Sequence, residues 1–224
     1  MNFLSHYYID WEIDDPHYTL GKILPDLLRN FKKGLRIKAS EDIAIEFEYL
    51  QPLHKGIENH HQVDFHFHNS DFFKKYSNEI KVILKTEAYD SIRKYYYFYA
   101  HILLEMMLDR LLLKKNREIG TKFYEQLREI KKETISGFLR YNGVDIPAKE
   151  FFNYLSGFVN ARYLFEYIDN DKLLYALGRI NYRAGLYHFT SADFEKLKGK
   201  VGDIESLLHE DYLEIFSEIR KKIS

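Results

Sequence analysis

The chain has no cysteine, and this absence excludes disulfides, a thiol nucleophile and thiolate metal sites. Net charge is only −1, so the broad basic surface of many nucleic-acid-binding proteins is not expected. No apolar run approaches the roughly 18 residues of a membrane-spanning helix, and the N-terminus lacks the basic and apolar regions of a signal peptide. We therefore expect a soluble cytoplasmic protein without a nucleic-acid or membrane partner.

Proline and glycine are also scarce, with 4 and 11 residues, and strand-like alternation between turns is hard to find. Hydrophobic residues make up 46% of the chain, which is enough for a substantial core. Helical periodicity is common, and no linker or repeat divides the sequence. The sequence therefore predicts one all-α domain over residues 1–224.

Helices are predicted over residues 18–31, with a kink or break at Pro25, and from residues 40–42 into a histidine-rich segment, with a bend near Pro52. The segment 32–40 is expected to be a loop. Further helices are expected over residues 72–86, 89–115, from there to about 139, 151–167, 170–182 and 191–222. Residues 69–71 indicate a stop and an N-cap before the helix at 72, and Asn142-Gly143 indicates a turn. The segment 89–115 is apolar nearly all round, which indicates a central buried helix.

Four of the ten histidines lie within residues 60–68. In a helix, His60, Asp64 and His68 are spaced i, i+4, i+8 and share one face. Imidazole and carboxylate groups at this spacing can bind a divalent transition metal. A solvated, histidine-rich helix end is the alternative. His66 is the weakest candidate, because it would face with His68 only in an extended chain.

A second polar face interrupts the predicted buried helix. His101, Glu105 and Asp109 again lie at i, i+4, i+8, and buried charges need compensation. A metal ion could compensate them, especially if this face meets His60 and Asp64 as facing helices of a bundle do. Alternatively, His101 pairs with Glu105, and Asp109 pairs with an arginine such as Arg110 or Arg183.

Several isolated residues carry weaker signals. His6 follows a short apolar start and Asp26 follows Pro25, and each could be structural. Arg179 and Arg183, one turn apart before a turn at Gly185, could bind an anion or only pair with acids. The sequence has no glycine-rich phosphate loop, serine-nucleophile motif or HExxH pair.

Taken in order, these residues resemble the acyl-carrier-protein phosphodiesterase family, a divergent branch of the HD-type metal phosphohydrolases. The opening from Met1 to His6 is similar to the start of that family. Gly21 and Asp26 match its Gly-x-Leu-x-x-Asp-Phe segment, and Gly56-Ile57 with His60 and Asp64 match its Gly-Ile…His-x-x-Ile-Asp segment. Residues 153–155, 167–169 and 177–183 resemble its later Tyr-Leu…Tyr-x-Asp…Leu…Arg pattern.

The chain departs from the family pattern at three places. His61 stands where members usually carry arginine, and Phe67-His68 replaces an expected Thr-Asp pair. The central Asp-His-Phe-Leu motif corresponds to residues 105–108, where the sequence is Glu-Met-Met-Leu, with His101 one turn earlier. These changes predict a site with rearranged ligands.

The resemblance implies an HD-type helical bundle and an enzyme, a hydrolase that cleaves the 4′-phosphopantetheine phosphodiester of holo-acyl carrier protein in fatty acid biosynthesis. It implies a divalent ion, Mn²⁺ first, with Mg²⁺, Fe²⁺ or Zn²⁺ as alternatives. The implied metal ligands are His60, Asp64, Asp26, His101, Glu105 and His6. The implied catalytic residues are Glu105 as proton acceptor and Arg183 as phosphate-neutralising group.

Acyl carrier protein, the implied partner, is acidic and would need a basic docking face. Candidates for that face are Arg29, Lys32, Lys33, Arg36 and Lys38, or Arg110, Lys114, Lys115 and Arg117, although ordinary solvated charge explains them as well. Two alternatives remain open for the function. One is a metal-dependent phosphohydrolase for a nucleotide or another small phosphate ester, and the other is a helical binding protein that has lost catalysis.

Overall fold

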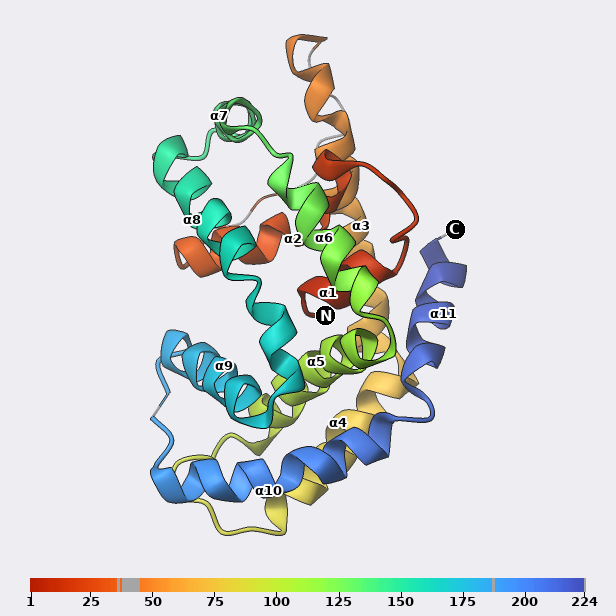
Figure 1. The fold of residues 1–224 in the computed structure, drawn as a ribbon, viewed down its shortest axis with the longest axis vertical. Coiled ribbons are helices and arrows are strands. Elements are labelled where there is room, and N and C mark those ends of the chain that lie inside the picture. The colour runs from red at the N-terminus through yellow and green to blue at the C-terminus, as the bar shows by residue number, and fades with distance from the viewer. Residues whose placement is uncertain (36, 38–44, 187, 224) are drawn as a thin grey trace.

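The computed structural model describes residues 1–35, 37, 45–186 and 188–223. Within these ranges all regular secondary structure is helical and no strand occurs. The elements are α1 (Phe3–Tyr8), α2 (Pro16–Phe31), η1 (Ile45–Leu50), α3 (Gln51–Asn69), α4 (Asp71–Lys85), α5 (Tyr96–Lys115), α6 (Arg117–Arg128), α7 (Lys132–Tyr141), α8 (Ala148–Ala161), η2 (Tyr163–Ile168), α9 (Asn170–Arg183), α10 (Ser191–Leu208) and α11 (Tyr212–Ile223). They pack into one helical domain, as predicted (Figure 1).

Helices α2 and α3 form the most extensive pair of the fold. Helix α2 begins where the Asp15 side chain accepts hydrogen bonds from the backbone N–H groups of His17 and Tyr18, at 2.8 and 3.1 Å. It then continues through Pro25 to Phe31, so the alternative of a break at this proline is wrong. Helix α3 has Pro52 in its first turn, where proline costs no helical hydrogen bond.

Two glycines allow α2 and α3 to approach closely. A methyl group on Gly21 would collide with the carbonyl oxygen of Leu53, and one on Gly56 would collide with that of Tyr18. Only glycine fits at both positions. The close crossing brings the second half of α2 beside the middle of α3, where Asp26 and His60 lie.

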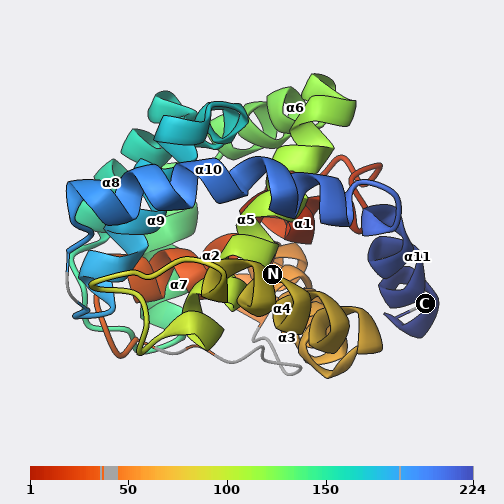
Figure 2. The ribbon, with the colours of Figure 1, turned by 90° about the horizontal axis from the view of Figure 1, so that it is seen from below.

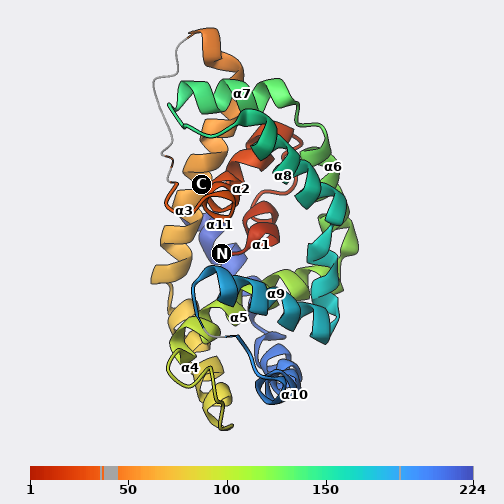
Figure 3. The same cartoon turned by 90° about the vertical axis from the view of Figure 1, so that its left-hand side faces the viewer.

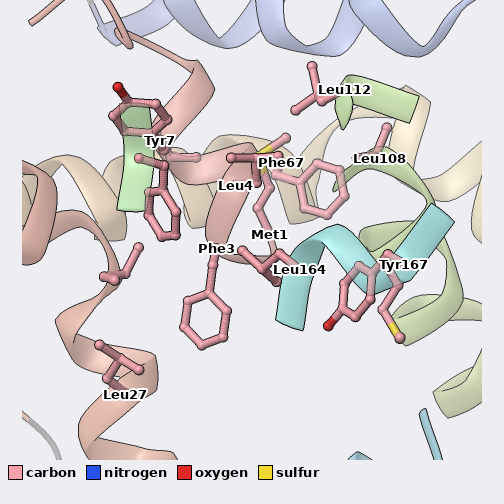
Figure 4. Packing of buried hydrophobic residues seen from close by; sticks show 14 of the residues in the cluster. Met1, Phe3, Leu4, Tyr7, Leu27, Phe67, Leu108, Leu112, Leu164 and Tyr167 are labelled. Carbon is pink, nitrogen blue, oxygen red and sulfur yellow. The ribbon is translucent and has the colours of Figure 1, made fainter. Parts of the chain in front are cut away.

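The short helix α1 lies near the middle of the molecule (Figure 1 and Figure 3), where it contacts α2, α5 and α6. Its side chains Phe3, Leu4 and Tyr7 are buried in the core, together with Met1 (Figure 4). Helix α5 is buried along most of its length, as its sequence predicted. Helix α10 crosses one end of the bundle and packs on α4 and α9 (Figure 2).

Several predicted helices are shorter than expected. The charged helix after α5 divides into α6 and α7, residues 151–167 divide into α8 and η2, and residues 191–222 divide into α10 and α11. Tertiary contacts explain such breaks: the hydroxyl of Tyr76 donates a hydrogen bond to Asp211, between α10 and α11. Residues 89–95 are not helical, because Asp193 accepts hydrogen bonds from the backbone N–H groups of Asp90 and Ser91.

Other expectations are met. Ser70 caps α4 through its hydroxyl, at 3.0 Å from the backbone N–H of Phe73. Gly143 and Gly185 have positive φ values of 60° and 75°, as predicted turns require. The start of the helix expected at residues 40–42 lies outside the described residues, and its continuation divides into η1 and α3 next to Pro52. Of the helices that the structure does describe, none combines the length and hydrophobicity needed to cross a membrane.

Candidate metal centre

The predicted ligands come from four helices: α1, α2, α3 and α5. They fall into two neighbouring groups rather than one. The first group contains His6 of α1, Asp26 of α2 and His60 of α3, and the second contains His68 of α3 with His101 and Glu105 of α5.

In the first group, the ligand atoms of His6, Asp26 and His60 all lie within 4.8 Å of one another. The two imidazole rings are stacked, with centroids 4.1 Å apart. Asp64 lies beside them: its Oδ1 is 3.2 Å from Nε2 of His6, and its Oδ2 is 3.6 Å from Nε2 of His60. Four of the predicted ligands are therefore convergent.

Both histidines have the protonation state that a metal requires. Nδ1 of His60 lies 2.8 Å from the carbonyl oxygen of Lys22, which can only accept, so Nδ1 carries the proton and Nε2 is left as the ligand atom. Burial lowers the pKa of His60 and brings that of His6 down to about 3, so both rings are neutral.

His6 gives the most direct test of whether a metal fits. Both of its ring nitrogens are buried and have no hydrogen-bond partner in the part of the chain that the structure describes, since the approach of Nε2 to Asp64 lacks hydrogen-bond geometry. A buried polar atom without a partner is costly. An ion held between His6, Asp26 and His60 would give one of these two His6 nitrogens a partner, so the residues present fit a divalent cation.

The centre is buried on the histidine side and open on the carboxylate side. The side chains of His6 and His60 are 0% and 2% exposed, whereas those of Asp26 and Asp64 are 25% and 31% exposed. Burial raises the pKa of Asp26, although His60 opposes this shift. A ligand could therefore reach the site past the two carboxylates.

In the second group, Nε2 of His101 lies 2.9 Å from Oε1 of Glu105. Nε2 of His68 lies 3.1 Å from Nε2 of His101 and 3.3 Å from the same Glu105 oxygen. The i, i+4, i+8 spacing makes His68 a candidate ligand together with His60 and Asp64, but the ligand set that the family resemblance implies does not contain it. Its partners could not be identified without knowing how α3 and α5 cross.

The amino group of Met1 lies between the two groups, 2.6 Å from Asp64 and 3.2 Å from Glu105. Burial works to lower the pKa of this amine, but the two carboxylates outweigh it and raise the pKa to about 11. Burial works to raise the pKa of Asp64 and of Glu105, but this ammonium and contacts with the neighbouring imidazole rings outweigh it and hold the pKa of both carboxyls well below the ordinary value. The site thus already favours a cation.

Asp109 has a different role from the one predicted. Among the described residues it pairs with no arginine but accepts hydrogen bonds from the backbone N–H groups of Leu4 and Ser5, at 3.2 and 2.7 Å, and from the Ser5 hydroxyl at 2.6 Å. Burial raises its pKa to about 7, although these hydrogen bonds oppose the shift. Asp109, which lies on α5, therefore caps the N-terminus of α1 and positions His6.

The predicted arginines differ in their exposure and in their distance from the predicted ligands. Arg183 is exposed at the end of α9, and among the described contacts none joins it to a predicted ligand. Arg110 is buried against Glu205 and the carbonyl oxygen of Tyr167, which excludes it from a docking face. Arg29 is 63% exposed and lies 3.7 Å from Asp26, at the rim of the centre. Of the basic docking candidates, Arg36 and Lys38 lie outside the described residues.

Comparisons of the chain with protein-family models, with curated proteins and with solved structures found no match. The geometry of the two groups and the motifs of the sequence are therefore the features that point to a function.

Proposed function

We propose that this protein is a metal-dependent phosphohydrolase with an HD-type helical bundle, and that it cleaves the 4′-phosphopantetheine phosphodiester of holo-acyl carrier protein. The observation that carries the metal-dependent part is the convergence of two buried neutral histidines with Asp26 and Asp64. The motif resemblance supports the choice of substrate.

His6, His60 and Asp26 would hold the ion, with Asp64 beside them. A bound Mn²⁺ or similar ion would polarise a phosphoryl oxygen and lower the pKa of a bound water. Lys22 fixes the tautomer of His60 through its carbonyl oxygen, as outer-shell partners of metal ligands commonly do. The exposed edge at Asp26 and Asp64 would admit the phosphodiester.

The geometry favours Arg29 over Arg183 for binding the phosphate. Arg29 lies next to Asp26 and is exposed enough to turn toward a substrate, and a guanidinium suits phosphate oxygens. Glu105 is an ionised carboxylate whose low pKa suits the binding of a cation better than the uptake of a proton. It is therefore better supported as a ligand than as the general base.

The test measures metal content and cleavage together. The purified full chain is reconstituted with Mn²⁺, and loss of phosphopantetheine from holo-acyl carrier protein is followed by the mass of the carrier. His60→Gln and Asp26→Asn should lose bound metal and reduce cleavage by more than the roughly 100-fold that loss of an outer-shell partner costs. His66→Gln, on the same helix, is the matched control.

Three results would separate the alternatives. Metal binding with cleavage of a nucleotide, but not of the carrier protein, would keep the metal site and change the substrate. A wild-type chain without bound metal after reconstitution would favour a binding protein. Unchanged metal content in His60→Gln would remove the assignment of the first group.

A further inference from the structure

The second group has the geometry of a metal site in its own right. Its three ligand atoms, Nε2 of His68, Nε2 of His101 and Oε1 of Glu105, form a triangle with sides of 2.9, 3.1 and 3.3 Å. Nitrogen and oxygen ligands bound at 2.0–2.2 Å around one ion lie roughly 3 Å apart. The spacing of these atoms therefore matches one face of a coordination shell.

The hydrogen bonds around His68 orient it for this role. Its Nδ1 lies 2.8 Å from the backbone carbonyl oxygen of Asp64. Because a carbonyl only accepts, Nδ1 carries the proton of the neutral ring, and Nε2 presents a lone pair to the group. Glu105 also presents a lone pair, so one proton on His101 is all that the three side chains themselves offer to join two acceptors, and the Met1 ammonium lies 3.2 Å from the same Glu105 oxygen.

Asp64 connects the two groups. Its carboxylate lies against His6 and His60, while its backbone carbonyl orients His68. Across the Met1 nitrogen, Asp64 faces Glu105, the carboxylate of the second group. The two groups are thus adjacent, with a carboxylate on each side of the Met1 amino group.

We propose that His68, His101 and Glu105 bind a second divalent transition-metal ion beside the first group, giving a two-metal centre. Two nitrogens and one carboxylate oxygen suit Mn²⁺, Fe²⁺ or Zn²⁺. His68 and His101 stand where the chain departs from the family pattern, so this site belongs to the rearranged part of the sequence. Any use of the second ion in phosphoester cleavage rests on the proposed function, whereas its binding does not.

The experiment measures metal stoichiometry on the full chain. The protein is stripped with a chelator, reconstituted with Mn²⁺, desalted and analysed for bound metal. The wild-type protein should hold two ions per chain, His68→Gln and His101→Gln one each, and the His66→Gln control two. Both substituted rings are about one-third exposed, so these variants should fold, which circular dichroism checks.

A second readout is the electron paramagnetic resonance spectrum. Two adjacent Mn²⁺ ions give a spin-coupled signal, which His101→Gln should replace with that of an isolated ion. If the wild type binds one ion, and both His68→Gln and His101→Gln still bind it, the proposal of a second site is overturned and the first site is left intact. If the wild type holds one ion, and this ion is lost in His101→Gln but kept in His60→Gln, the second site is supported and the proposed active site is removed. No bound ion at all would overturn both.

Discussion

At the scale of single residues, Asp109 joins α5 to α1 through three hydrogen bonds. Asp109→Asn keeps one acceptor oxygen but turns amide donors toward the N–H groups that the carboxylate satisfied. Leaving buried donors unsatisfied costs about 1–3 kcal/mol. We expect the free energy of unfolding in urea to fall by about 2 kcal/mol, and Mn²⁺ affinity to weaken because His6 is displaced.

The control for this prediction is Asp203→Asn, which changes an exposed aspartate on α10. It should leave both the unfolding midpoint and the metal affinity unchanged. If Asp109→Asn were as stable as the wild type and bound Mn²⁺ equally well, Asp109 would not position α1.

We expect the buried Lys22 to make the free energy of unfolding depend on pH. Its side chain is buried, and it donates hydrogen bonds to Asp10 and to the carbonyl oxygen of Tyr7. Burial lowers its pKa from 10.5 to about 8, although Asp10 opposes this shift. Because the folded state binds the proton more weakly than the unfolded chain, the stability contributed by Lys22 is present above pH 10.5 and is lost as pH falls through 8.

The comparison is between the wild type and Lys22→Met in urea unfolding from pH 10.5 to 8. Relative to the variant, the wild type should lose up to about 3 kcal/mol as the pH falls, whereas the exposed control Lys33→Met should show no such slope. A difference that stays constant across this range would mean that Lys22 remains charged in the folded protein.

Residue spacing in the sequence predicted which polar side chains share a helix face, and the structure agrees for His60 with Asp64 and for His101 with Glu105. The division into two groups was not predictable, because it depends on how α3 crosses α5. Nor did the sequence show that Asp109 would bind backbone N–H groups of α1, since a carboxylate has the same charge whether its partner is an arginine or a helix end.

At the scale of elements, the close crossing of α2 and α3 depends on Gly21 and Gly56. Gly21→Ala would place a methyl group against the backbone carbonyl of Leu53, which cannot move aside as a side chain could. Overpacking typically costs 1–3 kcal/mol, and backbone on both sides puts this site at the upper end, about 3 kcal/mol. The same displacement should separate Asp26 from His60 and weaken metal binding.

Gly199→Ala is the matched control, since Gly199 lies in α10 with no heavy atom within 4 Å of an added methyl group. It should be neutral or stabilising by up to about 1 kcal/mol, because alanine is the better helix former. Both variants are measured by urea unfolding. Equal stability of the two would show that α2 and α3 tolerate a wider separation.

Helix boundaries were predictable where a local signal marks them and not where tertiary contacts set them. Ser70 before α4 and Gly143 after α7 are local signals, and the structure confirms both. The segment between α6 and α7 contains neither proline nor glycine, so nothing in the local sequence ends α6 there. The hydrogen bond of Tyr76 to Asp211, which helps to set the break after α10, joins residues far apart in the chain.

At the scale of the whole molecule, the two groups join α1, α2, α3 and α5, four helices that all contribute buried residues to the core. An ion bound only by the folded state must therefore stabilise the entire domain. At a free concentration 100 times the dissociation constant, one site adds about 2.7 kcal/mol to the free energy of unfolding. For a chain of this length, that corresponds to a rise of about 5 to 10 °C in the unfolding temperature.

Thermal unfolding with Mn²⁺ and with a chelator tests this linkage. The wild type should show the rise, and His60→Gln and His101→Gln should each lose part of it, because each removes one site and leaves the other. The His66→Gln control should keep all of it. An equal rise in all four proteins would place the bound ion outside both groups, since substitutions at their centres would then have left its affinity unchanged.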